Sequence, residues 1–284
     1  FLTLCRVMNY TRTAQMLNVT QPTVTQHIRY LEGQYGCSLF SYVGKTLSLT
    51  PQGKRLRDFA LSMAYNSQRI QECMRQSGEL LPAMRLGATK TIGEFVIGPM
   101  ISAYLRENPA CRLSLLVDNT HTLLGLLERG ELDFAVLEGF FDKSKYGYQL
   151  YKNESFLGVC AVNHSLADRT LTIDDIMSQN IIIREPGSGT RAIFEQLLMQ
   201  HNYSFESISQ TTVVSDFSVI KQLVCDGIGI AFLYEPVVRA ELQNGRLKKL
   251  HLTDMEAQRE FNYVFLKQSL FLEDWQRFFA SQID

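Results

Sequence analysis

The sequence predicts an α/β protein with an N-terminal winged helix-turn-helix, a linker helix and a two-lobed body. Three observations predict it: two short helices around a tight turn within residues 10–35, heptad-spaced apolar residues beyond residue 51, and alternating strand and helix patterns from residue 84. Such alternation is typical of βαβ units and a largely parallel sheet. We divide the chain into a DNA-binding head (1–50), a linker helix (51–78), a hinge (79–83) and an effector-binding body (84–284).

Basic residues gather in the head. Residues 1–58 hold seven Lys and Arg against two Asp and Glu, a balance of +5, which leaves 21 basic and 27 acidic residues elsewhere, a balance of −6. A basic head on an acidic body fits a polyanion contact confined to the head. An ordinary solvated surface would show the same charges. The 284 residues, 45% of them hydrophobic, suffice for one small module and a domain of about 200 residues.

The first element is a helical pair that turns at Asn18-Val19. Thr11 is a suitable N-cap for a helix that ends near Leu17, and Thr20 can cap a second helix whose first turn tolerates Pro22. The second helix carries a stripe of apolar residues at i, i+4 and i+7, which we expect to be buried: Val24, Ile28 and Leu31.

The opposite face of the second helix is polar and carries Gln21, Thr25, Gln26 and Arg29. Side chains of this kind bind base edges in the major groove: Gln suits adenine, Thr contacts several bases, and Arg binds guanine or phosphate. The pattern therefore predicts a DNA-recognition helix. A small helical hairpin with a polar outer face is the alternative.

A short hairpin is expected next, with its turn at Gly44-Lys45 and with Leu47 and Leu49 pointing inward. Such a wing would lay Lys45 beside the phosphate backbone, where it adds affinity but no sequence information.

Thr50 followed by Pro51 repeats the pattern of an N-cap and a proline in the first helical turn, and it predicts where the linker helix begins. Apolar residues then recur at alternating spacings of three and four, which is a heptad seam: Leu56, Phe59, Met63, Asn66, Ile70 and Cys73. We expect a dimerisation helix with a polar opposite face that includes Arg69, and with Asn66 setting the register. An amphipathic helix packed on its own domain is the alternative. Residues 78–82 would end the helix and form the hinge.

The body alternates strands and helices in two sets, which predict two lobes with a ligand cleft between them. We place lobe I at about 84–155 and 258–284, and lobe II at about 156–257. The expected strands cover 84–88, 112–117, 132–137, 156–162, 181–184, 211–214, 228–233 and 261–266, and the expected helices cover 92–106, 123–129, 192–201, 219–225 and 272–280.

Two turns in the body have the composition of an anion site. One is Thr89-Lys90-Thr91, and the other is the segment 185–191, which contains Ser188, Gly189, Thr190 and Arg191. Both put hydroxyls and free backbone N–H groups at a helix N-terminus, where an anion is favoured. Simple helix capping is the alternative for the hydroxyls, and pairing with Glu185 or Glu195 is the alternative for Arg191. Glu138, near the end of a cleft strand, would oppose a multiply charged anion.

The sequence carries no nucleophile elbow, P-loop, dinucleotide fingerprint or metal-ligand spacing, so we expect no enzyme, no metal and no cofactor. Six scattered cysteines without a C-x-x-C pair fit a reducing cytoplasm. Neither a signal-peptide pattern nor an apolar run of membrane length is present. An exported solute-binding protein would leave the basic head unexplained. Because the chain begins at Phe1 within an apolar helical pattern, we expect that a few residues precede it.

Taken in order, several motifs resemble those of LysR-type transcriptional regulators over nearly the whole chain. They are residues 10–14, 21–25, 31–32, 39–40, 49–53 and 226–230. The resemblance implies a linker helix that pairs two chains and an effector domain similar to periplasmic solute-binding proteins. It further implies a dimer or a dimer of dimers on double-stranded promoter DNA, with a small-molecule effector and RNA polymerase as further partners.

By position, the resemblance assigns Gln21, Pro22 and Thr25 to base contacts, and Arg12 and Lys45 to phosphate. Gln26 and Tyr42 depart from the family, which often has Arg there, so contact shifts toward Gln21, Thr25 and Arg29. The turn at residues 186–191 resembles a subgroup of regulators of sulfur assimilation and carbon fixation. That likeness implies an inorganic oxyanion or a small phosphorylated or carboxylated metabolite as effector.

Overall fold

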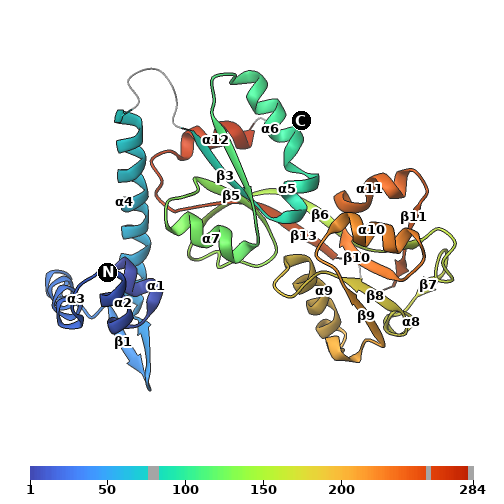
Figure 1. Ribbon diagram of the computed structural model, residues 1–284, viewed down its shortest axis with the longest axis horizontal. Helices are drawn as coiled ribbons and strands as arrows, with labels where there is room; N and C mark the ends of the chain where they lie inside the picture. The colour runs from blue at the N-terminus through green and yellow to red at the C-terminus, as the bar shows by residue number, and fades with distance from the viewer. Residues whose placement is uncertain (76–82, 254–256, 281–284) are drawn as a thin grey trace.

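The computed structural model describes residues 1–75, 83–253 and 257–280. Figure 1 shows a small head, one long helix beside it, and an elongated body. Residues 76–82 lie outside the described residues. They contain the expected end of the linker helix, at residue 78, and most of the hinge expected over residues 79–83.

The head consists of α1 (Leu2–Val7), α2 (Tyr10–Met16), α3 (Gln21–Tyr35) and the hairpin of β1 (Phe40–Val43) and β2 (Thr46–Leu49). As expected, Thr20 caps α3, with its hydroxyl accepting the Thr23 N–H at 3.3 Å. The expectation that Thr11 caps α2 is wrong. Asn9 has the extended backbone that an N-cap requires, and its side chain accepts the Arg12 N–H at 2.9 Å, so the helix begins before Thr11.

The hairpin has the expected register and turn. Val43 pairs with Thr46 across Gly44-Lys45, and Gly44 has a φ of 63°, a conformation that favours glycine. The head core contains most of the apolar residues that the sequence placed inward, with Leu31 half-buried at its edge: Val24, Ile28, Leu47 and Leu49.

The linker helix α4 (Pro51–Arg75) packs one face against lobe I. Leu61, Tyr65 and Arg69 are buried against lobe I, so the expectation of a polar face there is wrong. Asn66, which we expected to set the register of the seam, is engaged within its own chain. Its amide donates to the Gln268 carbonyl and accepts the Leu270 N–H, both at 3.0 Å. The helix therefore packs on its own domain, because that face is long enough to cover the edge of the body.

Part of the expected seam nevertheless stays exposed on α4. Phe59 is 48% exposed, Met63 55%, Ile70 38%, and Met74, one turn further on, 80%. These apolar side chains share one flank of the helix at spacings of four and seven. A second helix could pack there, and the expected dimerisation stays a prediction.

A buried ion network fastens α4 to the body. Arg69 is 1% exposed, and its Nε lies 3.4 Å from Asp133, which precedes strand β5 (Phe134–Glu138). Asp133 also accepts the Tyr65 hydroxyl at 2.9 Å and the Arg85 backbone N–H at 2.7 Å. Arg69 donates further to Glu72 at 3.0 Å. The network joins the linker helix to two adjacent strands of lobe I.

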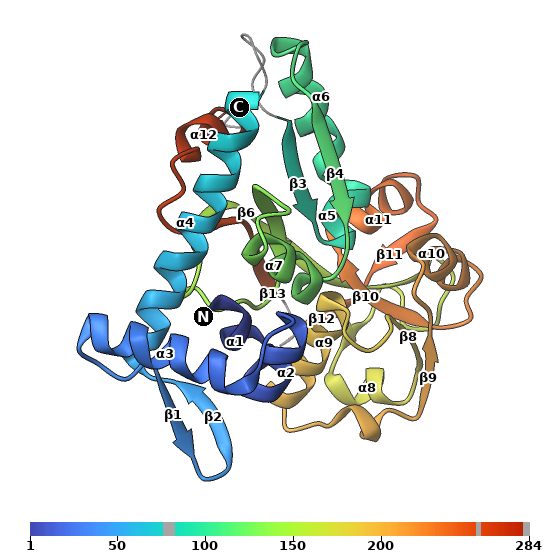
Figure 2. The same ribbon diagram turned by 60° about the vertical axis from the view of Figure 1, so that its left-hand side comes forward.

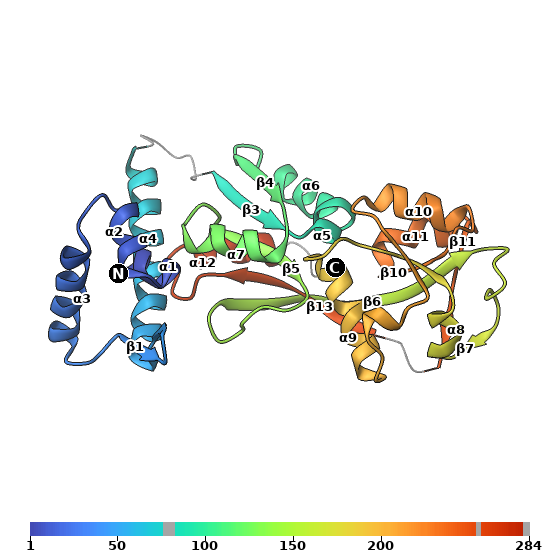
Figure 3. The same ribbon diagram turned by 60° about the horizontal axis from the view of Figure 1, so that its bottom comes forward.

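One continuous sheet runs through the body in the order β4-β3-β5-β13-β6-β10-β8-β9, with β11 also paired to β6. Its other strands are β3 (Met84–Ala88), β4 (Leu113–Val117), β6 (Gly147–Ala161), β8 (Asn180–Ile183), β9 (Gln210–Val213), β10 (Ile230–Tyr234), β11 (Leu247–Lys249) and β13 (Ala257–Phe265). The long antiparallel pair of β6 and β13 passes through both halves and joins the two lobes, as Figure 3 shows. A small separate sheet pairs β7 (Thr170–Leu171) with β12 (His251–Leu252).

Helices pack around this sheet: α5 (Lys90–Phe95), α6 (Ile97–Glu107), α7 (Thr120–Glu128), α8 (Ile173–Met177), α9 (Gly189–Gln200), α10 (Phe217–Cys225), α11 (Glu235–Gln243) and α12 (Leu272–Ala280), with a 3₁₀ turn at Phe205–Ser207. The single helix expected over 92–106 is broken at Val96, whose φ and ψ of −123° and −45° are not helical. Gly93 allows α5 to approach β4, since a Cβ there would lie 2.5 Å from Val117.

Strand β6 begins at Gly147, well before the expected start at residue 156. Its first half borders β13 on one side, and Tyr148 and Leu150 remain 45% and 48% exposed. Because that half buries little apolar surface, it lacks the continuous apolar run by which a buried strand is recognised.

We expect Asp133→Ala to lower the free energy of unfolding by about 3 kcal/mol, because it leaves Arg69 charged and underpaired in an apolar interface. Urea titration measures the loss. Glu131→Ala is the control. It removes the partner of Arg129, and because the Glu131 side chain is 53% exposed, it should cost under about 0.5 kcal/mol. Equal losses in the two variants would contradict the structural role of the network.

Candidate functional site

The recognition face of α3 is available to a ligand. Gln21, Gln26 and Arg29 are exposed and Thr25 is half-buried. The Gln21 amide donates to the Thr25 hydroxyl at 2.8 Å, so these two side chains lie together on one face of the helix. Pro22, exposed in the first turn, belongs to the same end of α3. Arrangements of this kind can present polar groups to base edges in the major groove.

The expected phosphate contacts flank that face. Arg12 is exposed on α2, and Lys45 is exposed at the tip of the wing. Figure 1 shows α3 on the side of the head away from the body and the wing projecting beyond it. The seven residues predicted for DNA contact are therefore solvent-accessible to different degrees, and none is buried by the body.

The two predicted ligand turns meet in the cleft between the lobes. A cavity of about 490 Å³ there is lined by Thr89, Lys90, Glu94, Val117, Asp118, Asn119, Thr120, Glu138, Arg184, Glu185, Ser188 and Gly189. A second cavity of about 420 Å³ shares Thr120, Glu138, Ser188 and Gly189 with it and reaches Arg191. The turn after β3 and the turn after β8 thus face one cleft, although they are about 100 residues apart in sequence.

The hydroxyls in these turns are not used for helix capping. Thr89 and Ser188 occupy the N-cap positions of α5 and α9, yet neither side chain makes a capping hydrogen bond. The Thr89 hydroxyl is also buried with no hydrogen-bond partner within the described part of the chain, and so is that of Thr190. Partnerless buried hydroxyls are uncommon in proteins. Capping, the alternative interpretation, therefore does not account for them.

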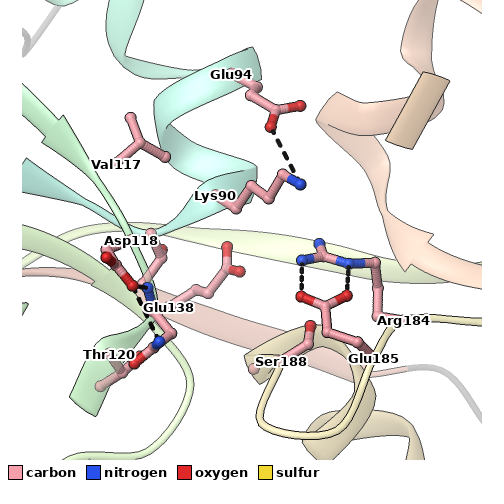
Figure 4. Close-up of a pocket in the computed structure, with 12 residues that line it drawn as sticks. Lys90, Glu94, Val117, Asp118, Thr120, Glu138, Arg184, Glu185 and Ser188 are labelled. Atoms are coloured by element: carbon pink, nitrogen blue, oxygen red, sulfur yellow. Dashed lines mark hydrogen bonds and ion pairs between the residues drawn. The ribbon is translucent and has the colours of Figure 1, made fainter. Parts of the chain in front are cut away.

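Thr91 does not line the cavity but orients a residue that does. Its buried hydroxyl donates to Glu138 Oε1 at 2.8 Å. The other oxygen of that carboxyl, Oε2, has no hydrogen-bond partner among the residues that the structure describes. In Figure 4 the Glu138 side chain points into the space between Lys90 and Arg184.

Glu138 has an unusual charge state for a carboxyl. Burial raises its pKa to about 8, although the Thr91 hydrogen bond and the charge of Arg184 act in the opposite direction. The expectation that Glu138 opposes a multiply charged anion stays a prediction, and the raised pKa would weaken that opposition below about pH 8. Because ionisation would leave a charge desolvated at the floor of the cleft, the group stays mostly protonated and can donate a hydrogen bond from Oε2.

The two predicted cations of the cleft are already paired. Lys90, from lobe I, donates to the Ser215 carbonyl of lobe II at 2.6 Å and lies 3.9 Å from Glu94. Arg191 binds Glu195 at 2.7 Å, which is one of the pairings that the sequence offered, and its predicted contact with a ligand stays a prediction. Its guanidinium also lies over the Phe205 ring at 4.2 Å.

Arg184 is a cleft residue that the sequence interpretation missed. It is 4% exposed, donates to both oxygens of Glu185 at 2.7 and 2.8 Å, and covers the Phe217 ring at 4.4 Å. Its place at the carboxyl end of an expected strand was the available signal, since ligands bind at that edge of α/β sheets. Asp118 and Glu94 add acidic groups to the rim.

Within residues 1–75, 83–253 and 257–280, no group of three or more His, Cys, Asp or Glu is placed to hold a metal ion. Over the same residues, no helix has both the length and the apolar character that a membrane span requires.

Family models match both parts of the chain. The lysR-family bacterial regulatory helix-turn-helix matches residues 1–54, and the LysR substrate binding domain matches residues 77–281. The chain is 23% identical to the transcriptional regulator CysL of Bacillus subtilis, over 93% of this chain and 88% of CysL. It is 28% identical to the regulator CbbR of Rhodospirillum rubrum, over 94% of this chain and 88% of CbbR.

Solved structures share the fold. A full-length OxyR variant of Pseudomonas aeruginosa aligns with a TM-score of 0.62 at 20% identity, covering 99% of this chain and 91% of OxyR. The regulatory domain of Synechocystis CcmR, in complex with 2-PG, aligns with a TM-score of 0.62 at 20% identity, covering 71% of this chain and 98% of that domain.

The raised pKa of Glu138 predicts how stability depends on pH. The folded protein binds the Glu138 proton more tightly than the unfolded chain does. Protonated Glu138 therefore contributes its full share to the free energy of unfolding below pH 4.5, and this share is lost as pH rises through about 8. We expect Glu138→Gln to remove this loss, so the variant gains stability relative to wild type between those pH values. Urea titration across the range measures the difference. A difference that does not change with pH would show that Glu138 is ionised throughout.

Loss of a predicted base contact and loss of a predicted phosphate contact should affect DNA binding differently. Gln21→Ala should reduce discrimination between sequences by about 1–3 kcal/mol, because it removes a base contact. Lys45→Ala should weaken binding to all sequences alike and lower the slope of log K against log salt by about 1. Fluorescence anisotropy with matched and mismatched duplexes measures both. If the two variants behave identically, α3 does not present Gln21 to the bases.

Proposed function

The chain belongs to the LysR family of bacterial transcriptional regulators, and we propose that it binds promoter DNA as a dimer of dimers and senses a small oxyanion in its cleft. The family and its regulatory role rest on the two matching models, which together cover residues 1–54 and 77–281. The relatives that the chain matches are transcriptional regulators and not enzymes. The class of effector and the assembly are the parts that we propose.

The observation that carries the ligand proposal is the set of buried, partnerless polar atoms at the cleft. Thr89 Oγ1 and Glu138 Oε2 both belong to residues that line the larger cavity, and both lack a hydrogen-bond partner among the described residues. Leaving a buried polar group unsatisfied costs about 1–3 kcal/mol. A ligand that accepts a hydrogen bond from each of them would recover that cost.

The charges around the cleft favour a small ligand of low charge. Lys90 and Arg184 can attract an anion, but each already has a carboxylate partner, Glu94 and Glu185 respectively. A ligand with several charges would compete poorly with these pairs and would approach Asp118 at the rim. A small monocarboxylate offers acceptor oxygens with the least of that penalty, whereas sulfate and phosphate are equally compact but carry more charge and meet part of it. The CcmR domain with 2-PG is a similar protein that binds a small ligand.

The neutral Glu138 gives the proposed site a donor that most anion sites lack. A protonated carboxyl donates one hydrogen bond to an oxyanion, whereas an ionised one repels it. Thr91, by donating to Oε1, leaves the acidic proton to Oε2 on the cleft side. We therefore propose that ligand affinity falls as pH rises through about 8.

The exposed stripe on α4 supports the proposed pairing of chains. Phe59, Met63 and Ile70 present apolar surface on a helix whose other face is already covered by lobe I. Burial of apolar surface is the main driving force for such an association. RNA polymerase is a further proposed partner, and the cytoplasm is the proposed location.

At constant ionic strength and pH 7, we expect sulfate or phosphate at 100 times its dissociation constant to stabilise the protein by about 2.7 kcal/mol. That corresponds to a rise in melting temperature of roughly 5–10 °C. Small carboxylates are tested in parallel. Differential scanning fluorimetry measures the shift, and its repetition up to pH 9 should show the loss of affinity above about pH 8.

The double variant Ser188→Ala, Thr91→Ala tests whether the shift depends on the cleft. It removes one cleft hydroxyl and the hydroxyl that orients Glu138, and it leaves the apolar core of the fold unchanged. It should abolish the shift. Sulfate also stabilises many proteins non-specifically by exclusion from their surface, so a rise that survives in the double variant counts against the cleft. No rise with any of these anions would remove the proposed ligand class and leave the DNA-binding role intact.

A further inference from the structure

A further cavity lies next to the cleft, at the loop that follows β5. Its volume is about 360 Å³, which is within the usual range for pockets that hold small molecules. We name it the side pocket, and its lining includes Phe140, Phe141, Gln196, Gln200, Arg259 and Glu260. Figure 2 shows α9, which carries the two glutamines, beside β13, which carries Arg259 and Glu260. Of the described lining residues, Phe140 alone also lines a cleft cavity, so the side pocket is distinct from the cleft.

Arg259 differs from the other arginines in the part of the chain that the structure describes. It is the one that is partly buried and yet has no Asp or Glu within ion-pair distance, since every other partly or fully buried arginine has such a partner. Its guanidinium donates to the Gln258 carbonyl at 3.0 Å and to Gln196 Oε1 at 3.4 Å. Both acceptors are neutral, so the positive charge in the side pocket is not compensated by contact with a carboxylate.

Arg259 also keeps donors that are not used. A guanidinium carries five N–H groups, and the two hydrogen bonds to glutamine oxygens come from different Nη atoms. These bonds fix the orientation of the group and leave one N–H on each Nη for a ligand. The Nε–H is buried and has no partner among the described residues, which is uncommon for a buried donor. Carboxylates suit such a group, because their two oxygens accept from two N–H donors at once.

The side pocket favours a ligand with a single negative charge. Hydrogen bonds from Lys143 and Asn262 lower the pKa of Glu260, so this lining residue is itself charged. Lys143 pairs with Glu260 and offsets part of its charge. Repulsion from Glu260 nevertheless grows with the charge of the ligand. A monocarboxylate therefore fits the pocket better than a dianion does.

Two aromatic side chains form the apolar part of the side pocket. Phe140 is 61% exposed and Phe141 is half-buried. Phe141 is held by an edge-to-face contact with Tyr148, with ring centroids 6.0 Å apart. Covering an exposed phenyl ring with another apolar group is favourable, and aromatic rings pair in stacked or edge-to-face arrangements. These walls therefore suit a ligand with an aromatic ring beside its carboxylate.

We propose that the side pocket is a second ligand site, and that it binds a small aromatic monocarboxylate between Arg259 and the two phenylalanines. The carboxylate accepts the free Nη N–H groups, and the ring lies against Phe140. Such a ligand contacts lobe I through the loop after β5 and lobe II through α9. The site does not depend on the anion proposed for the cleft, because the two turns that form the cleft site do not line the side pocket.

Isothermal titration calorimetry on the whole chain at pH 7 tests the class of ligand. Phenylacetate and 3-phenylpropanoate are the probes, and we expect both to bind saturably. Acetate lacks the ring and phenylacetamide lacks the charge, so each should bind weaker by about tenfold or more. Absence of binding by both probes, or equal binding by acetate or phenylacetamide, would overturn the proposed class.

Gln200 and Gln243 provide a matched pair of variants that places the ligand. Both are exposed and both are the last residue of a helix, α9 and α11 respectively, but only Gln200 lines the side pocket, and Gln243 lines neither cleft cavity. Gln200→Glu adds a negative charge to the pocket and should weaken phenylacetate binding by about threefold or more. Gln243→Glu should leave the affinity within about twofold of wild type. Equal affinities in the two variants would contradict binding in the side pocket.

Two further variants separate the side pocket from the cleft. Arg259→Gln removes the charge and the Nη donors, and it should weaken phenylacetate binding by about tenfold or more. Circular dichroism checks its fold, and Gln200→Glu decides the question if Arg259→Gln does not fold. The double variant Ser188→Ala, Thr91→Ala should keep the phenylacetate affinity within about twofold. Loss of binding in the double variant, or full binding in folded Arg259→Gln, would overturn the assignment to the side pocket.

Discussion

The buried pair of Arg69 and Asp133 is the interaction on which the arrangement of the molecule depends. Taking two charges out of water is costly, so the pair depends on the hydrogen bonds that its neighbours add. The Arg69 Nε that faces Asp133 makes no hydrogen bond within the described part of the chain. Tyr65, Arg85 and Glu72 supply the added bonds. Since its members come from the linker helix and from lobe I, the network holds α4 against the sheet. The head, continuous with α4, is thereby brought to α7.

Two buried carboxyls lie at opposite ends of β5 and have different roles. Asp133, just before the strand, meets two guanidinium groups and serves the structure. Glu138, its last residue, meets a hydroxyl instead of a contacting cation, and burial raises its pKa to about 8. A buried carboxyl whose oxygens are hydrogen-bonded and ion-paired stabilises the fold. A buried carboxyl with one oxygen that lacks a hydrogen-bond partner and faces a cleft is suited to bind a ligand. Distance from a cation, not residue type, separates the two.

The local features of the fold could largely be predicted from residue patterns. The cap at Thr20, the turn at Asn18, the wing turn at Gly44 and most body strands depend on neighbours within a few residues, and the structure confirms them. A few errors were local, such as the cap placed at Thr11 instead of Asn9, but the larger ones arose where distant residues intervene. Arg69 resembles a surface residue until Asp133 is placed beside it, and Asn66 resembles a seam residue until Gln268 approaches.

By itself, the sequence determined the class of fold, the polar face of α3 and the two turns that meet in the cleft, because caps, periodicity and turn residues act locally. Only the tertiary structure decided that Arg184 joins the cleft, that Lys90 and Arg191 are already paired, and that burial raises the pKa of Glu138. Charge state and pairing follow from burial and from groups far away in the chain. Those quantities exist only once the sheet has brought its strand ends together.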